Sequence, residues 1–88
     1  MIVNKAVARA NFLNNNKVFK NIFEVLNNAI IHDSELGYNY TESDYTLPDN
    51  FNKPDNFTQI LMEEIAKGGY TNTQIEVIGN YVTFYLEF

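Results

Sequence analysis

The chain has 88 residues, a formal net charge of −5 and no cysteine, and 45% of its residues are hydrophobic. This length predicts a single compact domain over residues 1–88, and the hydrophobic content is sufficient for a packed core. The lack of cysteine excludes a disulfide scaffold, a thiolate nucleophile and any cysteine-bound metal centre. Because secreted domains of this size usually need disulfides, a cytoplasmic location is expected. No apolar run approaches the roughly 18 residues of a membrane span, so no membrane partner is expected.

Charge is distributed unevenly along the chain. Residues 1–20 contain no acidic residue, and their cations form a candidate basic patch of Lys5, Arg9, Lys17 and Lys20. The remainder of the chain is strongly acidic. Two interpretations are open: the basic segment packs beside the acidic part of the same fold, or the two charged surfaces dock a partner or a second copy. The overall acidity does not favour direct binding to nucleic acid.

The segment from Val3 to Ile31 has helical periodicity. Its apolar stripe consists of Ala8, Phe12, Phe19, Phe23, Leu26 and Ile30. Asn14, Asn15 and Asn16 interrupt this pattern, because Asn competes for backbone hydrogen bonds inside helices. Either one long helix passes through this weak middle, or a helix ends near Leu13 and a second begins with Asn16 as its N-cap. We favour the break, and the common phase of the stripe predicts that both parts cover the same sheet.

The middle of the chain predicts a strand followed by a long loop. Large apolar or aromatic residues alternate with small or polar ones over Leu36–Ser43, which is typical of a strand. The loop covers Tyr45–Asn56 and contains two prolines. Leu47 and Phe51 are the residues expected to hold it against the core.

A further helix is expected after Asn56, which is a candidate N-cap. Gln59 occupies the position at which a capping box places Glu or Gln. The apolar face of this helix consists of Phe57, Ile60, Leu61 and Ile65. Gly68 and Gly69 follow and can supply the left-handed conformation that ends many helices.

The last two segments, Tyr70–Ile78 and Tyr81–Phe88, predict a β-hairpin. Gly79 comes first in the two-residue loop between them, which suits a type II′ turn and pairs Ile78 with Tyr81. This register places the predicted core on one face, formed by Ile75, Val77, Val82, Phe84, Leu86 and Phe88. The opposite face is a candidate interface, formed by Gln74, Glu76, Ile78, Tyr81, Thr83 and Tyr85.

Together these elements predict an α+β fold in the order α(α)-β-α-β-β. The expected structure is a small antiparallel sheet of about three strands with two or three helices packed on one face. The candidate interface then lies on the opposite face of the sheet. Tyr is enriched at protein interfaces, although aromatic pairing across strands, or cover by the first helical segment, would also explain this face.

No catalytic or metal-binding pattern is present. His32 and Ser34 are close in sequence at a predicted helix end, without the strand and glycine context of a nucleophile. Asp44, Asp49 and Asp55 enrich the loop in oxygen ligands, but they lack the regular spacing of a calcium loop. We therefore expect neither enzymatic activity nor a cofactor.

The sequence favours a small acidic protein-interaction module that binds a partner protein. Abundant Asn and a small acidic chain are typical of AT-rich bacteria and their phages, so a phage-encoded protein that binds a host protein is one form of this hypothesis. Its acidic surface would then mimic a polyanion. The alternatives are an oligomeric structural component of a larger assembly, such as a phage particle, and a small-ligand binder with a pocket under the long loop.

Overall fold

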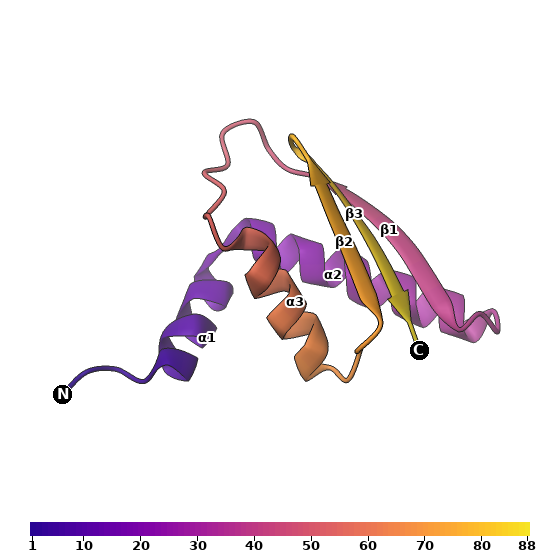
Figure 1. Ribbon diagram of the computed structural model, residues 1–88, viewed down its shortest axis with the longest axis horizontal. Coiled ribbons are helices and arrows are strands. Elements are labelled where there is room, and N and C mark those ends of the chain that lie inside the picture. The colour runs from indigo at the N-terminus through magenta and orange to yellow at the C-terminus, as the bar shows by residue number, and fades with distance from the viewer.

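The computed structural model describes residues 1–88 as three helices and one three-stranded antiparallel sheet (Figure 1). The elements are α1 (Lys5–Asn15), α2 (Lys17–Glu35), β1 (Tyr40–Thr46), α3 (Phe57–Lys67), β2 (Thr73–Ile78) and β3 (Tyr81–Glu87). β3 lies between β1 and β2 and pairs antiparallel with both. The α+β class, the element order and the number of strands are as predicted. None of the helices combines the length and the apolar composition that crossing a membrane requires.

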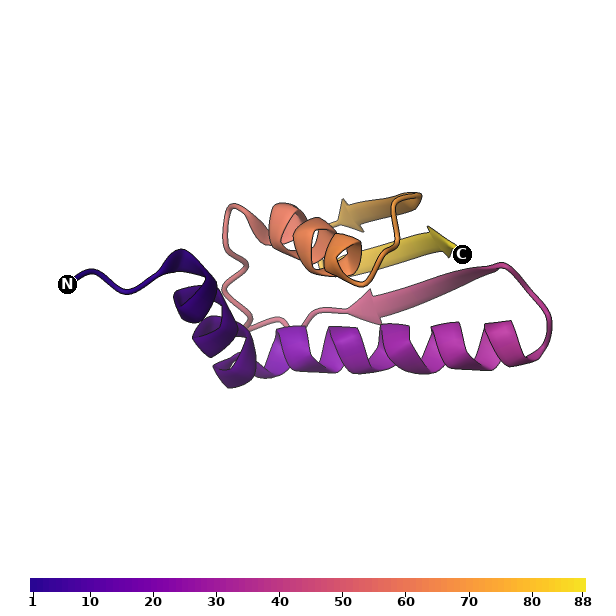
Figure 2. The same ribbon diagram turned by 90° about the horizontal axis from the view of Figure 1, so that it is seen from below.

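The two N-terminal helices are separate. α1 ends at Asn15 and α2 begins at Lys17, and the Asn16 side chain accepts a 3.2 Å hydrogen bond from the Phe19 amide. The predicted break and N-cap are therefore confirmed. The expectation that both parts cover the same sheet is wrong, because α1 buries no residue and turns away from the sheet (Figure 2). Asn16 has an extended backbone, which redirects the chain between the two helices.

The strand predicted over Leu36–Ser43 is displaced in the structure. α2 continues to Glu35, and the amides of Gly37 and Tyr38 close its last turn by bonding to carbonyls of that turn, in a Schellman motif. Gly37 has a φ of 88°, the left-handed conformation that this motif requires. β1 consequently starts at Tyr40 and extends to Thr46, which shortens the predicted loop at its beginning.

α3 has the predicted apolar face, and all four of its residues are buried: Phe57, Ile60, Leu61 and Ile65. The predicted capping box is wrong. The Asn56 side chain makes no capping hydrogen bond. The side-chain amide of Gln59 instead donates a 3.0 Å hydrogen bond to the Glu63 carboxylate. Gly69, with a φ of 96°, takes the left-handed position after the helix, as expected.

The hairpin has the predicted register, with Ile78 opposite Tyr81. Gly79 has a φ of 58°, and no residue other than glycine has a positive φ, which is the pattern of a type II′ turn. The inner face of the central strand is fully buried, and its residues are Val82, Phe84 and Leu86. Ile75 and Val77 share this inner face but are half-buried, because β2 lies at the edge of the sheet.

The prediction that Phe88 belongs to the core is wrong. Phe88 lies beyond the end of β3 and is 41% exposed, with its ring edge-on to Tyr70 at 6.2 Å. A change at the C-terminus is therefore expected to disturb the fold less than the sequence alone indicates.

The core lies between the sheet and the two helices that cover it, with α2 along β1 and α3 beside β2 (Figure 2). The long loop closes onto this core as predicted. Leu47 is buried, and the Phe51 ring lies 6.0 Å from Phe57 and 6.5 Å from Phe19. Thr41 is the one buried polar residue, and its hydroxyl donates a 2.5 Å hydrogen bond to Asp33 of α2. This bond fixes β1 against α2.

Candidate functional site

The face of the sheet opposite the helices, here called the outer face, carries an unusual set of side chains. Because side chains alternate along a strand, every second residue of each strand lies on this face. Its residues are Tyr40, Glu42, Asp44, Thr46, Gln74, Glu76, Ile78, Tyr81, Thr83, Tyr85 and Glu87. All acidic residues of the three strands are in this set, and the strands contain no lysine or arginine. All charged groups of the outer face are therefore acidic.

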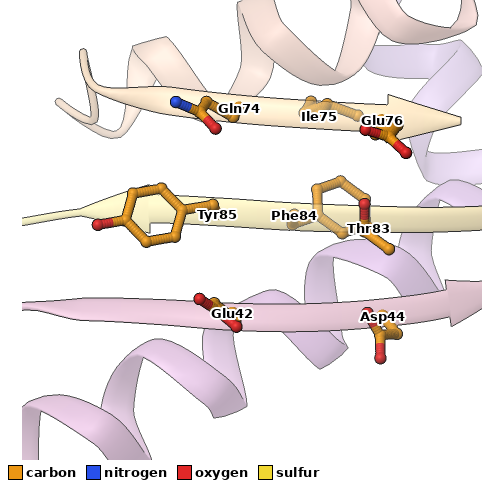
Figure 3. Close-up of a pocket in the computed structure, with 8 residues that line it drawn as sticks. All are labelled: Glu42, Asp44, Gln74, Ile75, Glu76, Thr83, Phe84 and Tyr85. Atoms are coloured by element: carbon orange, nitrogen blue, oxygen red, sulfur yellow. The ribbon is translucent and has the colours of Figure 1, made fainter.

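Antiparallel register arranges these residues in rows across the sheet. One row is Glu42, Tyr85 and Gln74, and the next is Asp44, Thr83 and Glu76. Figure 3 shows Glu42 and Asp44 of β1 on one side of the central strand, and Gln74 and Glu76 of β2 on the other. Thr83 is short, so a shallow hollow of about 400 Å³ lies over the middle of the sheet. The hollow is thus flanked by carboxylates on both sides.

Tyr85 borders this hollow and is held in place by its neighbours. Its hydroxyl donates a 2.8 Å hydrogen bond to Glu87, and its ring stacks on Tyr40 with 5.9 Å between centroids. Tyr38 continues the aromatic row, 5.8 Å from Tyr40. The hydrogen bond to Glu87 is the main cause that raises the pKa of Tyr85, with smaller contributions from burial and from Glu42. The Tyr85 hydroxyl therefore remains a donor to Glu87 up to a higher pH than an ordinary tyrosine would.

The other end of the outer face is more open. Tyr81 and Ile78 lie opposite each other there and are 46% and 67% exposed. Hydrogen bonding to Asp44 is the main cause that raises the pKa of the Tyr81 hydroxyl. This end therefore offers apolar and aromatic area next to a carboxylate, a combination typical of protein interfaces.

The structure brings all six residues of the candidate interface onto this one face. Sequence reasoning missed its β1 residues, which are Tyr40, Glu42, Asp44 and Thr46. The position of the first strand in the sheet decides whether they join the hairpin, and no local pattern encodes that position. The alternation in the correct segment, which places Thr41 inside, was the only available signal.

The candidate basic patch is divided between two helices. Lys5 and Arg9 lie on α1, whereas Lys17 and Lys20 lie on the first turn of α2. Arg9 is directed into the fold, where its Nη1 lies 3.3 Å from Glu63 and 3.6 Å from Glu64 of α3. The α3 carboxylates thus neutralise one of the four cations.

The sites considered for catalysis and metal binding are dispersed. The Ser34 hydroxyl donates to the backbone of α2 at Ile31, beside an exposed His32. Asp44 lies on the outer face, whereas Asp49 accepts a hydrogen bond from Asn80 at the hairpin turn. No three potential ligands of the His, Cys, Asp or Glu type lie close enough together to hold a metal ion. The carboxylates of the outer face are therefore spread over a surface.

An apolar hollow lies between α2 and α3, on the opposite side of the sheet. It has a volume of about 260 Å³, and Leu86 contributes to its lining. Its apolar lining also includes Leu13, Phe23, Leu26, Ile30, Ile65 and Tyr70. None of the loop residues 47–56 takes part in it, so it is distinct from the ligand pocket predicted under that loop.

Comparisons with protein-family models, with curated proteins and with solved structures gave no match to this chain.

Proposed function

We propose that the chain is a small, non-enzymatic protein-binding module whose outer face docks a basic surface of a partner protein. One observation carries this proposal: every acidic strand residue lies, together with three tyrosines, on the one sheet face that no helix covers. Charge complementarity of this kind accelerates association and selects among partners. The three outer-face tyrosines supply contact area with little rotamer entropy to lose.

The hollow over Thr83 suits the head group of a lysine or arginine. Glu42 and Asp44 border it on one side and Glu76 on the other, while the Tyr85 ring stands at one end. A cation placed against an aromatic ring gains about 0.5–2 kcal/mol, depending on how far it is desolvated. The same acidic face would compete with nucleic acid for a basic groove on the partner protein. A phage- or prophage-encoded protein that binds a host protein is consistent with this mode of action.

Site-directed photocrosslinking tests the proposal directly. A benzoylphenylalanine at position 83 is expected to give adducts with a partner in cells, and the same residue at Lys20 on α2 serves as a matched control. Adding the neutral changes Glu42→Gln and Glu76→Gln should reduce the adducts from position 83, as should raising the salt concentration. Adducts from position 20 alone would assign binding to the helical side and refute the proposal.

A second candidate function is an oligomeric component of a larger assembly. It is favoured by the exposed apolar side chains of the first residues and of α1, which are Met1, Ile2, Val3, Val7 and Phe12. Light scattering at several concentrations should show that the chain self-associates. The double variant Val3→Ser with Val7→Ser should abolish this self-association. A monomer at all concentrations would retire this function and leave the first proposal intact.

A further inference from the structure

β2 is an edge strand whose outer side is unpaired. The strand order is β1-β3-β2, so β1 and β2 are the two edges of the sheet. α2 packs along β1 and α3 lies beside β2, and Figure 2 shows β2 at the margin of the molecule with no strand beyond its free edge. The β2 edge is therefore the one available for pairing with another chain.

The backbone groups that face this free edge can be assigned. The Asn72 carbonyl accepts a 3.1 Å hydrogen bond from the Glu87 amide, which places Asn72 and every second residue after it on the side of β3. The amides and carbonyls of Thr73, Ile75 and Val77 therefore point to the free edge. They offer three amides and three carbonyls to an added strand.

The sequence of β2 leaves its edge open to a strand of opposite charge. Natural edge strands are often blocked by lysine, by proline or by a bulge, and β2 has none of these; its one charged residue is Glu76. Ile75 and Val77 on its inner face are only half-buried, and Ile78 on the outer face is 67% exposed. An additional strand would bury the remaining exposed area of Ile75 and Val77.

We propose that an extended segment of the partner protein adds to β2 as a fourth, antiparallel strand, which rests on and deepens the proposed function. In an antiparallel pair, residues directly opposite each other share a face. The segment therefore carries apolar residues opposite Ile75 and Val77, where they extend the core. Its alternate residues are lysine or arginine and lie beside Glu76, at the rim of the hollow on the outer face.

Charge decides between this occupant and a second copy of the chain. Pairing β2 with β2 would join two outer faces whose only charged groups are carboxylates, on two chains of net charge −5. Like charges brought together in this way oppose association. A strand with lysine or arginine side chains carries charge opposite to that of the outer face, and it can form the same backbone hydrogen bonds with β2 as a second copy would. A basic strand is therefore the occupant that fits this edge.

The test uses synthetic peptides and the full chain. A capped seven-residue peptide that alternates valine and lysine is titrated by NMR, with a valine–glutamate peptide as the charge control. We expect binding of the lysine peptide alone, with exchange of the Thr73, Ile75 and Val77 amides slowed roughly tenfold or more at saturation. N-methylation of the valine amides, which face β2 in the antiparallel pair, should weaken binding about tenfold or more. N-methylation of the lysine amides should leave binding unchanged.

The outcomes separate this inference from the proposed function. Equal binding after valine N-methylation, or unchanged exchange at the three amides, overturns the added strand. If that binding still weakens with salt and with Glu42→Gln and Glu76→Gln, the outer face remains the docking surface. Glu76→Lys should abolish binding of the lysine peptide, whereas Glu24→Lys on α2, with the same change in net charge, should not. Equal binding of the glutamate peptide overturns both proposals.

Discussion

The Tyr85 hydroxyl donates a 2.8 Å hydrogen bond to the Glu87 carboxylate, two residues further along the same face of β3. Together with the ring of Tyr40 stacked on it, this bond fixes Tyr85 in one orientation across the sheet. A side chain that is already ordered loses less conformational entropy when a partner binds. The outer face is therefore preorganised at this end and open at the end of Tyr81 and Ile78.

This hydrogen bond makes the ionisation of Tyr85 a probe of the outer face. A pKa raised in the folded state means that the stabilisation is fully present below the ordinary value of 10.0 and is lost as the pH rises through the raised pKa. We expect Glu87→Gln to lower the pKa of Tyr85 towards its ordinary value. The ring-carbon NMR shift of Tyr85 during a pH titration measures this change, with Tyr85→Phe assigning the signal. An unchanged pKa in Glu87→Gln would contradict the role of the carboxylate.

Phe84 and Tyr81 test the separation of the two sheet faces. Phe84 is 3% exposed on the inner face, so Phe84→Ala should lower the free energy of unfolding by about 3–5 kcal/mol. Tyr81→Ala combined with Tyr85→Ala should reduce photocrosslinking to the partner far more than stability. Urea unfolding followed by circular dichroism measures the first quantity. A large loss of stability in the tyrosine double variant with crosslinking intact would refute the proposed interface.

Local signals predicted most of the fold. Gly79 in a two-residue loop determined the register of the hairpin, and the Phe57-to-Ile65 spacing gave the buried face of α3. The beginning of β1 was misplaced because Gly37 fits two patterns. It can be a small residue in an alternating strand or the left-handed residue after a helix, and the backbone hydrogen bonds of the Schellman motif select the second.

The four β1 residues of the outer face required tertiary information. The hairpin register located Tyr81, Tyr85 and Glu76 without any structure. Glu42 and Asp44 joined them only because β1 pairs with β3, at a separation of about forty residues along the chain. The direction of α1 likewise depended on the backbone of one residue, Asn16. The apolar stripe alone indicated that α1 and α2 face the same way.

The cap at Asn16 is itself testable. Asn16→Ala removes the acceptor for the Phe19 amide and should lower the free energy of unfolding by about 0.5–2 kcal/mol. Ala also favours helical backbone, so α1 and α2 should become partly continuous, with more helix by circular dichroism. Asn28→Ala on the exposed face of α2 is the matched control, with little effect on stability expected. Equal stability of both variants would show that the cap contributes nothing.

Arg9 forms the ion pairs that link α1 to α3. α1 buries no residue, and Arg9 joins it to Glu63 and Glu64 of α3 across 3.3 and 3.6 Å. Arg9→Ala should therefore speed amide exchange throughout α1 while changing the global unfolding midpoint little, because the ion pair is partly exposed. Lys5→Ala removes the same charge from the same helix without breaking an ion pair, so it should have a smaller effect than Arg9→Ala.

The pKa of Glu63 predicts the pH dependence of this attachment. Hydrogen bonding from Gln59 within α3 is the main cause that lowers this pKa below its ordinary 4.5, and the charges of Arg9 and Lys5 on α1 lower it further. A lowered folded-state pKa gives stabilisation that is present above the ordinary value and is lost as the pH falls through the lowered one. The α1 amides should therefore lose protection on acidification, after correction for intrinsic exchange, and Arg9→Ala should reduce this pH dependence. Protection that is independent of both pH and Arg9 would mean that the Phe12–Phe19 ring contact holds α1 in place. Arg9 would then be free to act in a basic patch.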